Sequence, residues 1–218
     1  MRPERLALFA ALVALSSACP AKVDPPPQPM VMELPDAGPT GLARSARGNL
    51  RFKGPERLTG DFAAALGLRP EEVCSELGRY PCLSVHNVAL GGVDPYGPGL
   101  YEPSGVTAVT TPLVVERIAW SACSQRVDKD LVASANAVVF RGLPMTGQKL
   151  TNADGPEVTA VIGELTHRAL AREPYTNEVA TYVKLAKDIE ATGTAEPARE
   201  WMLSVCFAVL SSTESVFY

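Results

Sequence analysis

Apolar residues recur with the period of an α-helix along the last third of the chain. The periodic positions are Val158, Val161, Ile162, Leu165 and Ala169. An i, i+3, i+4, i+7 spacing places side chains on one face of a helix. Asp154 and Glu157 mark its start, and Pro174 marks its end, because the residue before a proline avoids the α region. The pattern therefore predicts an amphipathic helix between these residues.

Two more helices follow in the same region. Thr176 is placed to cap a helix that Gly193 terminates, with apolar positions at Val179, Tyr182, Val183, Ala186 and Ile189. The stretch from about Pro197 to Ser211 is apolar on nearly all sides. A helix without a polar face is typical of a protein core. We therefore expect this last helix to lie at the centre of the fold.

The middle of the chain has weaker helical patterns. A stripe from Leu113 to Val127, which includes Val114, Arg117, Ile118, Trp120, Ala122 and Cys123, predicts one helix. Thr59 is placed to cap a short helix ending near Leu66, and Pro70 to open another that Gly78 stops. The apolar run 137–140 fits a strand or a buried helical turn, and 143–153 fits a loop.

Residues 82–112 differ in kind from their surroundings. They contain five glycines and four prolines, of which Gly91, Gly92, Pro95, Gly97, Pro98 and Gly99 stand close together. Such a composition is typical of a long irregular loop. The fold class predicted is mainly α: a small disulfide-stabilised helical bundle with a long Gly/Pro-rich loop.

Composition narrows the class of protein. The 218 residues are 46% hydrophobic and 20% charged, which suits a packed domain. The formal net charge is −4, and basic residues form no block. Nucleic-acid binding depends on clustered Lys and Arg, so we expect no nucleic-acid partner.

The N-terminus has the organisation of an export signal. Two arginines precede an apolar run from Leu6 to Leu15, and small residues 16–18 follow it. The run is too short to span a bilayer, which needs roughly 20 apolar residues. We predict that residues 1–18 are a signal peptide removed before Cys19.

Residues Leu15 to Cys19 resemble the lipobox of bacterial lipoproteins, with leucine one place further from the cysteine than is usual in that family. The resemblance implies that Cys19 is lipidated and anchors the chain to a membrane. Pro20, in place of an aspartate after the cysteine, resembles the outer-membrane class, so we expect an outer-membrane lipoprotein of the cell envelope, facing the periplasm or the cell surface. A soluble secreted protein is the alternative.

Proline dominates the segment that follows. Seven prolines lie between residues 20 and 39, which favours an extended and semi-rigid chain. A spacer behind the lipid is the preferred interpretation, and a ligand for a partner domain is the alternative. Residues 43–53 form a basic, solvated arm. We therefore assign 19–57 to a lipid-anchored linker and arm, and 58–218 to the helical domain.

The chain has five cysteines, an odd number for an exported protein. If Cys19 carries lipid, four remain, which allow three connectivities. We favour Cys74 with Cys82, across a short turn, and Cys123 with Cys206, between two core helices.

A metal site is the alternative use of these cysteines. Cys74, Cys82 and His86 would need a fourth zinc ligand, for which Asp94 and His167 are the candidates. The spacing does not match the covalent haem motif, in which histidine directly follows the second cysteine. We predict no metal and no cofactor.

Only two histidines are available for acid–base chemistry near neutral pH. Catalytic, nucleotide-binding and metalloprotease motifs are absent from the sequence. His86 and Asp94 flank the glycine-rich loop, which also holds Tyr96 and Tyr101. Long loops with tyrosines are common at binding surfaces, so we predict that these four residues belong to a ligand or partner surface. A plain covering loop is the alternative.

The C-terminal third resembles a known group of bacterial proteins. Residues 165–179 (LTHRALAREPYTNEV) and 206–218 (CFAVLSSTESVFY) are similar to the end of planctomycete-type, cytochrome-associated domains of unknown function. The resemblance implies an exported protein with a helical C-terminus. It implies no catalytic residues.

Together these patterns favour an exported outer-membrane lipoprotein that acts as a binding or accessory subunit of an envelope protein assembly, without evident catalysis. The alternatives are an envelope redox or hydrolytic enzyme that uses His86 and Asp94, with or without a metal, and a purely structural lipoprotein.

Overall fold

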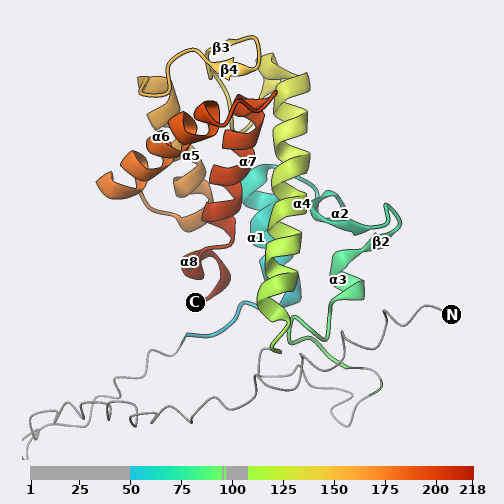
Figure 1. The fold of residues 1–218 in the computed structure, drawn as a ribbon. Helices are drawn as coiled ribbons and strands as arrows, with labels where there is room; N and C mark the ends of the chain where they lie inside the picture. Colours follow the sequence, from blue (N-terminus) through green and yellow to red (C-terminus); the bar gives the residue numbers. More distant parts are fainter. Residues whose placement is uncertain (1–49, 95, 97–107) are drawn as a thin grey trace, which may run out of the picture. The chain divides into compact units, whose positions relative to one another are not determined.

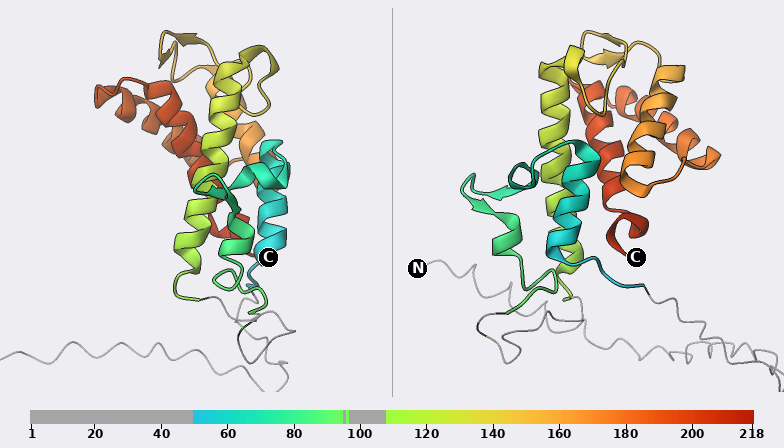
Figure 2. Two further views of the ribbon diagram at one scale, coloured as in Figure 1. Left: turned by 90° about the vertical axis from the view of Figure 1, so that its right-hand side faces the viewer. Right: turned by 180° about the vertical axis from the view of Figure 1, so that it is seen from behind.

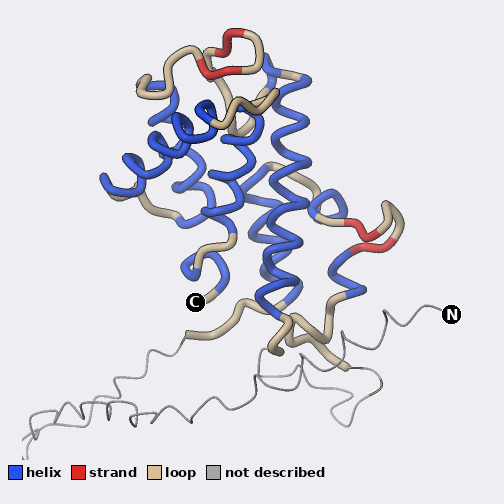
Figure 3. The backbone as a smooth tube through the Cα atoms, viewed as in Figure 1, coloured by secondary structure: helices blue, strands red, loops and turns tan. Residues whose placement is uncertain are grey.

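The computed structural model describes residues 50–94, 96 and 108–218, all within the compact unit Gly48–Tyr218. The predicted signal peptide, Cys19, most of the linker and Tyr101 lie outside the described residues. The helices are α1 (Pro55–Leu66), α2 (Pro70–Val73), α3 (Cys82–Val85), α4 (Thr111–Val132), η1 (Ser134–Asn136), α5 (Pro156–Leu170), α6 (Thr176–Ala191), α7 (Pro197–Leu210) and α8 (Thr213–Val216). The predicted helical class is confirmed, as Figure 3 shows.

Two antiparallel hairpins of two-residue strands complete the described elements. One joins β1 (Ser75–Glu76) to β2 (Tyr80–Pro81), and the other joins β3 (Met145–Thr146) to β4 (Lys149–Leu150). The second hairpin lies within the segment 143–153 that we expected to be a loop. Figure 1 shows it at the end of α4 that is distant from the C-terminus.

The C-terminal helices form the core as their pattern predicts. In α5, Val158, Val161, Ile162 and Leu165 are buried. Helix α7 packs against α4, α5 and α6, and its Trp201, Val205, Cys206 and Leu210 are fully or almost fully enclosed. Figures 1 and 2 show α7 and α4 side by side near the middle of the molecule. An all-round apolar helix is therefore the central element here.

The caps of α5 and α6 differ from those expected. Gly155, not Asp154, precedes α5, and Pro156 stands at the first helical position, where its fixed φ suits a helix. Tyr175 precedes α6, and its N–H donates to the Glu178 carboxylate over 2.7 Å. Thr176 is therefore the first residue of the helix and not its cap.

The domain begins earlier than residue 58. Helix α1 starts at Pro55, and Thr59 is a buried residue within it. Phe52 bridges Phe217 near the C-terminus, and the Lys53 ammonium lies 3.0 Å from the Asp61 carboxylate. The end of the predicted solvated arm is thus part of the fold. Short-range patterns missed this part of the fold because its partners lie up to 167 positions away along the chain, where the Tyr218 N–H donates to the Arg51 carbonyl.

The helix expected from Pro70 to Gly78 has only four residues. After Val73 the backbone of Cys74 is extended, and the chain turns back through Leu77 (φ 52°) and Gly78 (φ 68°). Two successive residues of positive φ are typical of the type I′ turn that connects hairpin strands. The correction has a tertiary cause, because Cys74 and Cys82 are joined across this hairpin.

The run 137–140 is neither a strand nor a helical turn. Its backbone N–H groups at Val138, Val139 and Phe140 donate to the Asp130 carboxylate over 2.9–3.0 Å. The Arg126 guanidinium lies 2.6 Å from the same carboxylate, and both charged side chains are almost fully buried. The Asp130 carboxylate therefore accepts the backbone N–H groups of this segment, which regular secondary structure would otherwise pair.

Candidate functional site

Both predicted disulfides are confirmed. Cys74 pairs with Cys82, and Cys123 pairs with Cys206, with Cα–Cα distances of 5.4 and 5.7 Å. The second bond joins α4 to α7, and both of its residues are completely buried. Every cysteine within the described part of the chain is therefore oxidised.

The first disulfide closes the base of a small projection that we name the hairpin lobe, residues 74–88. It comprises β1, β2 and α3, and Figures 1 and 2 show it extending sideways from the helical body next to α4. The backbone N–H of Cys82 donates to the carbonyl of Cys74 over 3.2 Å. A disulfide and a backbone ladder thus fix the lobe at the same point.

Glu76 fixes the lobe at a second point. Its Oε1 lies 2.9 Å from Nε2 of His86, which directly follows α3. Arg117, from α4, donates through Nε to Oε1 over 2.5 Å and through Nη2 to Oε2 over 2.6 Å. We name Glu76, His86 and Arg117 the Glu76 triad. It connects the hairpin, α3 and α4.

The triad is arranged to hold charge and not to transfer protons. The hydrogen bonds from Arg117, followed by that from His86, lower the pKa of Glu76 to about 2. A carboxyl group with so low a pKa is a poor proton acceptor near neutral pH. His86 contacts Glu76, whereas Asp94 accepts a hydrogen bond from the N–H of Tyr96 over 2.9 Å. No hydrogen bond or ion pair joins His86 to Asp94 among the described residues, so the predicted acid–base pair is not assembled.

The same geometry changes which residues could complete the zinc site that the sequence left as an alternative. Ligand atoms of Cys74, Glu76 and Cys82 lie within 4.8 Å of one another, and His86 adjoins Glu76. Glu76 thus occupies the place for which we considered Asp94 and His167, while His167 lies on α5 with Nδ1 3.9 Å from Glu173. Zinc binds thiolates, and neither sulfur of a disulfide is one. In this oxidised form the group is therefore a structural cross-link.

Asp94 and Tyr96, two residues of the predicted ligand or partner surface, lie close together, with Tyr96 exposed and Asp94 half-buried. The Tyr96 side chain is 97% exposed, and Asp94 supports its backbone through the short turn described above. Tyr101 lies outside the described residues. Of the four predicted surface residues, the structure therefore places His86 in the triad and leaves Asp94 and Tyr96 in the adjacent loop.

Sequence reasoning missed the large apolar side chains that the lobe exposes. They are Leu77, Tyr80, Val85 and Val88. On the neighbouring helix α4, Leu113 and Trp120 are also exposed, although we assigned both to the buried stripe. The signal that would have indicated the turn is the Leu77-Gly78 step after a short polar run, because glycine favours the positive φ of such turns.

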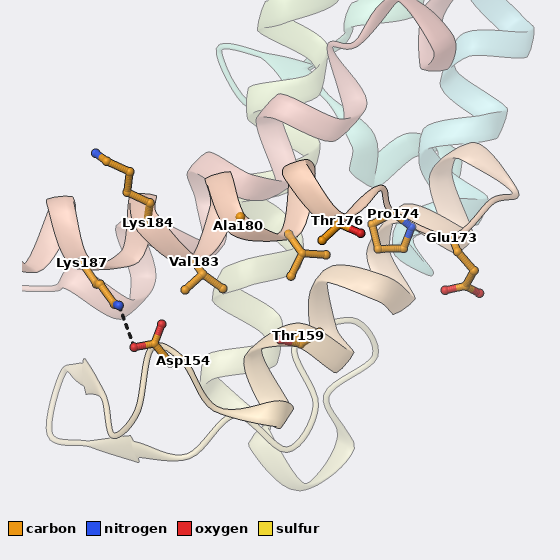
Figure 4. Close-up of a pocket in the computed structure, with 10 residues that line it drawn as sticks. Asp154, Thr159, Glu173, Pro174, Thr176, Ala180, Val183, Lys184 and Lys187 are labelled. Atoms are coloured by element: carbon orange, nitrogen blue, oxygen red, sulfur yellow. Dashed lines mark ion pairs between the residues drawn. The ribbon is translucent and has the colours of Figure 1, made fainter.

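A separate groove of about 730 Å³ lies between α5 and α6. Pro174, Val179, Ala180 and Val183 contribute its apolar part. Figure 4 shows Pro174, Ala180 and Val183 between the charged residues of its border. The Lys187 ammonium pairs with the Asp154 carboxylate at 2.7 Å, so this border is partly neutralised. None of the residues predicted for a site lies here.

Comparison with protein-family models, with curated proteins and with solved structures found no match. Among the described helices, none is long and apolar enough to cross a membrane.

Proposed function

We propose that this protein is an exported lipoprotein, acylated on Cys19, whose helical domain is a non-catalytic binding or accessory subunit of an envelope protein assembly at the outer membrane. The observation that carries the proposal is the pairing of Cys74 with Cys82 and of Cys123 with Cys206.

The disulfides support export. Stable disulfides form in the periplasm and outside the cell and are rare in the reducing cytosol. The bond between Cys123 and Cys206 lies in the core between the two central helices, so it belongs to the fold itself. Pairing of these four residues leaves Cys19 as the fifth cysteine of the chain, directly after the predicted signal peptide.

The site geometry supports binding in preference to catalysis. The carboxylate nearest to His86 is held by Arg117 and has a lowered pKa. Exposed apolar and aromatic side chains gather on the hairpin lobe instead. Exposed clusters of this type mark interaction sites on soluble domains.

The lipid is tested by comparing the wild type with Cys19→Ser in cell fractions and by intact mass. We expect the wild type in the outer-membrane fraction with a diacylglyceryl group on Cys19. Cys19→Ser should move to the soluble fraction, since a domain without the lipid has lost its anchor. Its mass before and after reduction controls for folding, because both disulfides should persist. A wild type with unmodified Cys19 in the soluble fraction would contradict the proposal that the protein is a lipoprotein.

The accessory role is tested by native mass spectrometry of the wild type after gentle extraction from its own membranes. We expect a second polypeptide in a fixed ratio. A solitary chain with a stoichiometric metal or small molecule would contradict this role and favour the enzyme hypothesis at His86 and Asp94.

A further inference from the structure

We propose that the tip of the hairpin lobe and the adjoining outer face of α4 form one docking surface for an envelope protein that presents an apolar patch bordered by a carboxylate. The surface consists of Leu77, Arg79, Tyr80, Leu113 and Trp120. The proposal rests on the binding role proposed above, and it specifies where the partner binds and which chemistry the partner supplies.

Leu77 is the most unusual residue of this surface. Its φ of 52° lies in the left-handed region, which leucine rarely adopts, and its side chain is 88% exposed. Glycine, asparagine and aspartate are the usual residues at this turn position because they tolerate positive φ. An exposed leucine therefore makes the hairpin less stable without packing against the domain. Residues held in such conformations concentrate at binding sites, where they are positioned for a ligand.

The outer face of α4 continues this surface. Leu113, Arg117 and Trp120 stand at i, i+4 and i+7 and therefore share one side of the helix. Leu113 is 67% exposed and Trp120 is 50% exposed. Arg117 lies between them along the chain and binds Glu76, the residue before Leu77. This ion pair holds the strand that precedes the tip against the stripe on α4, so the two apolar areas belong to one fixed unit.

The surface is held in place before any partner binds. The disulfide Cys74–Cys82 and the Glu76 triad fix the lobe. The rings of Trp120 and Phe207 pack in a T-shaped arrangement at a centroid distance of 5.8 Å. Binding then requires little ordering of side chains, which reduces its entropic cost. Trp, Tyr and Arg are also the residue types that contribute most often to binding energy at protein interfaces.

The charges of the surface specify the partner. Arg79 is exposed and forms no ion pair with any described residue, whereas the Glu76 carboxylate is compensated by Arg117. The excess positive charge is confined to the tip, because Glu116 on α4 is exposed and also forms no ion pair with a described residue. A carboxylate on the partner therefore complements the surface at Arg79. A lipid bilayer suits the surface less well, because burial in hydrocarbon would desolvate the Glu76–Arg117 pair between its two apolar areas. A protein partner can instead supply hydrogen bonds and bridging waters to that pair.

Site-specific photocrosslinking of the full-length, membrane-anchored protein in its own cells tests this surface. A benzophenone amino acid is placed at Tyr80 or at Trp120, and at Val132 as a control. Val132 lies on the same helix and is 89% exposed. We expect both test positions, and not the control, to crosslink to the same polypeptide, at an apolar segment that contains Asp or Glu. An equal adduct at Val132, an adduct with lipid or an adduct with a second copy of the chain would overturn the proposal.

Charge reversal tests the carboxylate. We expect Arg79→Glu to reduce the yield of the adduct at Trp120 at least tenfold, because it places a like charge against the partner. Lys149→Glu makes the same charge change on β4, at the end of the domain that is distant from the C-terminus (Figure 1), and should leave the yield unchanged. Equal effects of the two substitutions would show that only net charge matters and would overturn the assignment.

Leu77→Asn separates binding from stability. Asparagine tolerates positive φ, so we expect the melting temperature to rise by about 3 °C. The adduct at Trp120 should nevertheless fall at least tenfold, since the apolar tip is lost. An unchanged adduct would overturn the role of Leu77. If no adduct forms at Tyr80 or Trp120 while a second polypeptide still co-purifies, the surface is wrong and the binding role stands; absence of both contradicts the binding role itself.

Discussion

Asp130 shows how much one buried carboxylate can organise. It accepts three backbone N–H groups from residues 138–140 and also binds Arg126, one turn earlier on α4. Arg126 in turn donates through Nη1 to the carbonyl of Leu66 at the end of α1. The pair therefore joins α4, α1 and the segment after α4, and the loss of one partner leaves a buried charge without compensation.

Asp130→Asn should destabilise the domain by about 3–5 kcal/mol. Only one of the two terminal atoms of an amide can accept a hydrogen bond, and the neutral amide no longer compensates the charge of Arg126. Asp128→Asn is the matched control. Asp128 lies on the same helix in an exposed pair with Arg199, whose loss should cost only about 0.2–1 kcal/mol. Urea unfolding at neutral pH measures both, and equal losses would contradict the structural role of Asp130.

Glu76 makes the free energy of unfolding depend on pH in the acidic range. Because the pKa of Glu76 is about 2 in the folded protein and about 4.5 without its partners, the unfolded chain binds more protons between these values. Its contribution to stability is therefore complete above about pH 4.5 and decreases as the pH falls toward 2.

Glu76→Gln should flatten the decline of melting temperature between pH 4.5 and 2, since glutamine does not titrate. Glu71→Gln, at an exposed residue of the neighbouring α2, should keep the wild-type decline, because the pair of Glu71 with Arg69 is exposed on both sides. A Glu76→Gln profile parallel to that of the wild type would contradict the triad as the source of this dependence.

At the scale of elements, local sequence predicts the long helices, whereas tertiary contacts decide the structure of the lobe. Helices α5, α6 and α7 each extend over 14 residues or more, which is long enough for periodicity to show in the sequence. The lobe turns within eight residues, so the same apolar pattern fits one more helical turn or a hairpin. The disulfide and the contacts with α4 decide between them.

The two disulfides should contribute unequally to stability. They close loops of very different length, with sequence separations of 8 for Cys74–Cys82 and 83 for Cys123–Cys206. The bond that closes the longer loop restricts the unfolded chain more. The double alanine variant at Cys123 and Cys206 should therefore lose about 4–5 kcal/mol of its free energy of unfolding. The variant at Cys74 and Cys82 should lose about 2–3 kcal/mol. Chemical unfolding of both variants compares them, and the reverse order would contradict the entropic account.

For the molecule as a whole, the fold depends on its redox environment. The losses expected for the two disulfides add to about 7 kcal/mol, which is comparable to the total stability of a typical domain. A chain retained in a reducing compartment would therefore be marginally folded, which is consistent with the export proposed above.

Adding a dithiol reductant should lower the melting temperature of the wild type by about 15 °C or more, given about 2–4 °C for each kcal/mol in a domain of this size. The control is the variant with alanine at Cys74 and Cys82, whose melting temperature should fall less, because only the Cys123–Cys206 bond remains to be reduced. Calorimetry measures both proteins. A wild type insensitive to reductant after verified thiol exposure would contradict the stabilising role.

The sequence by itself determined the helical class and the three C-terminal helices, and it favoured, among three possible connectivities, the cysteine pairing that the structure shows. The helices follow from local periodicity, and the cysteine pairing could be narrowed because four cysteines allow only three connectivities. Only the tertiary structure decided the hairpin at Leu77, the support of residues 138–140 by Asp130, and the meeting of Glu76 with Arg117. Each of these depends on groups separated along the chain by a turn or by a whole helix. The free energy that selects them comes from burial and long-range hydrogen bonds, which a short stretch of sequence does not contain.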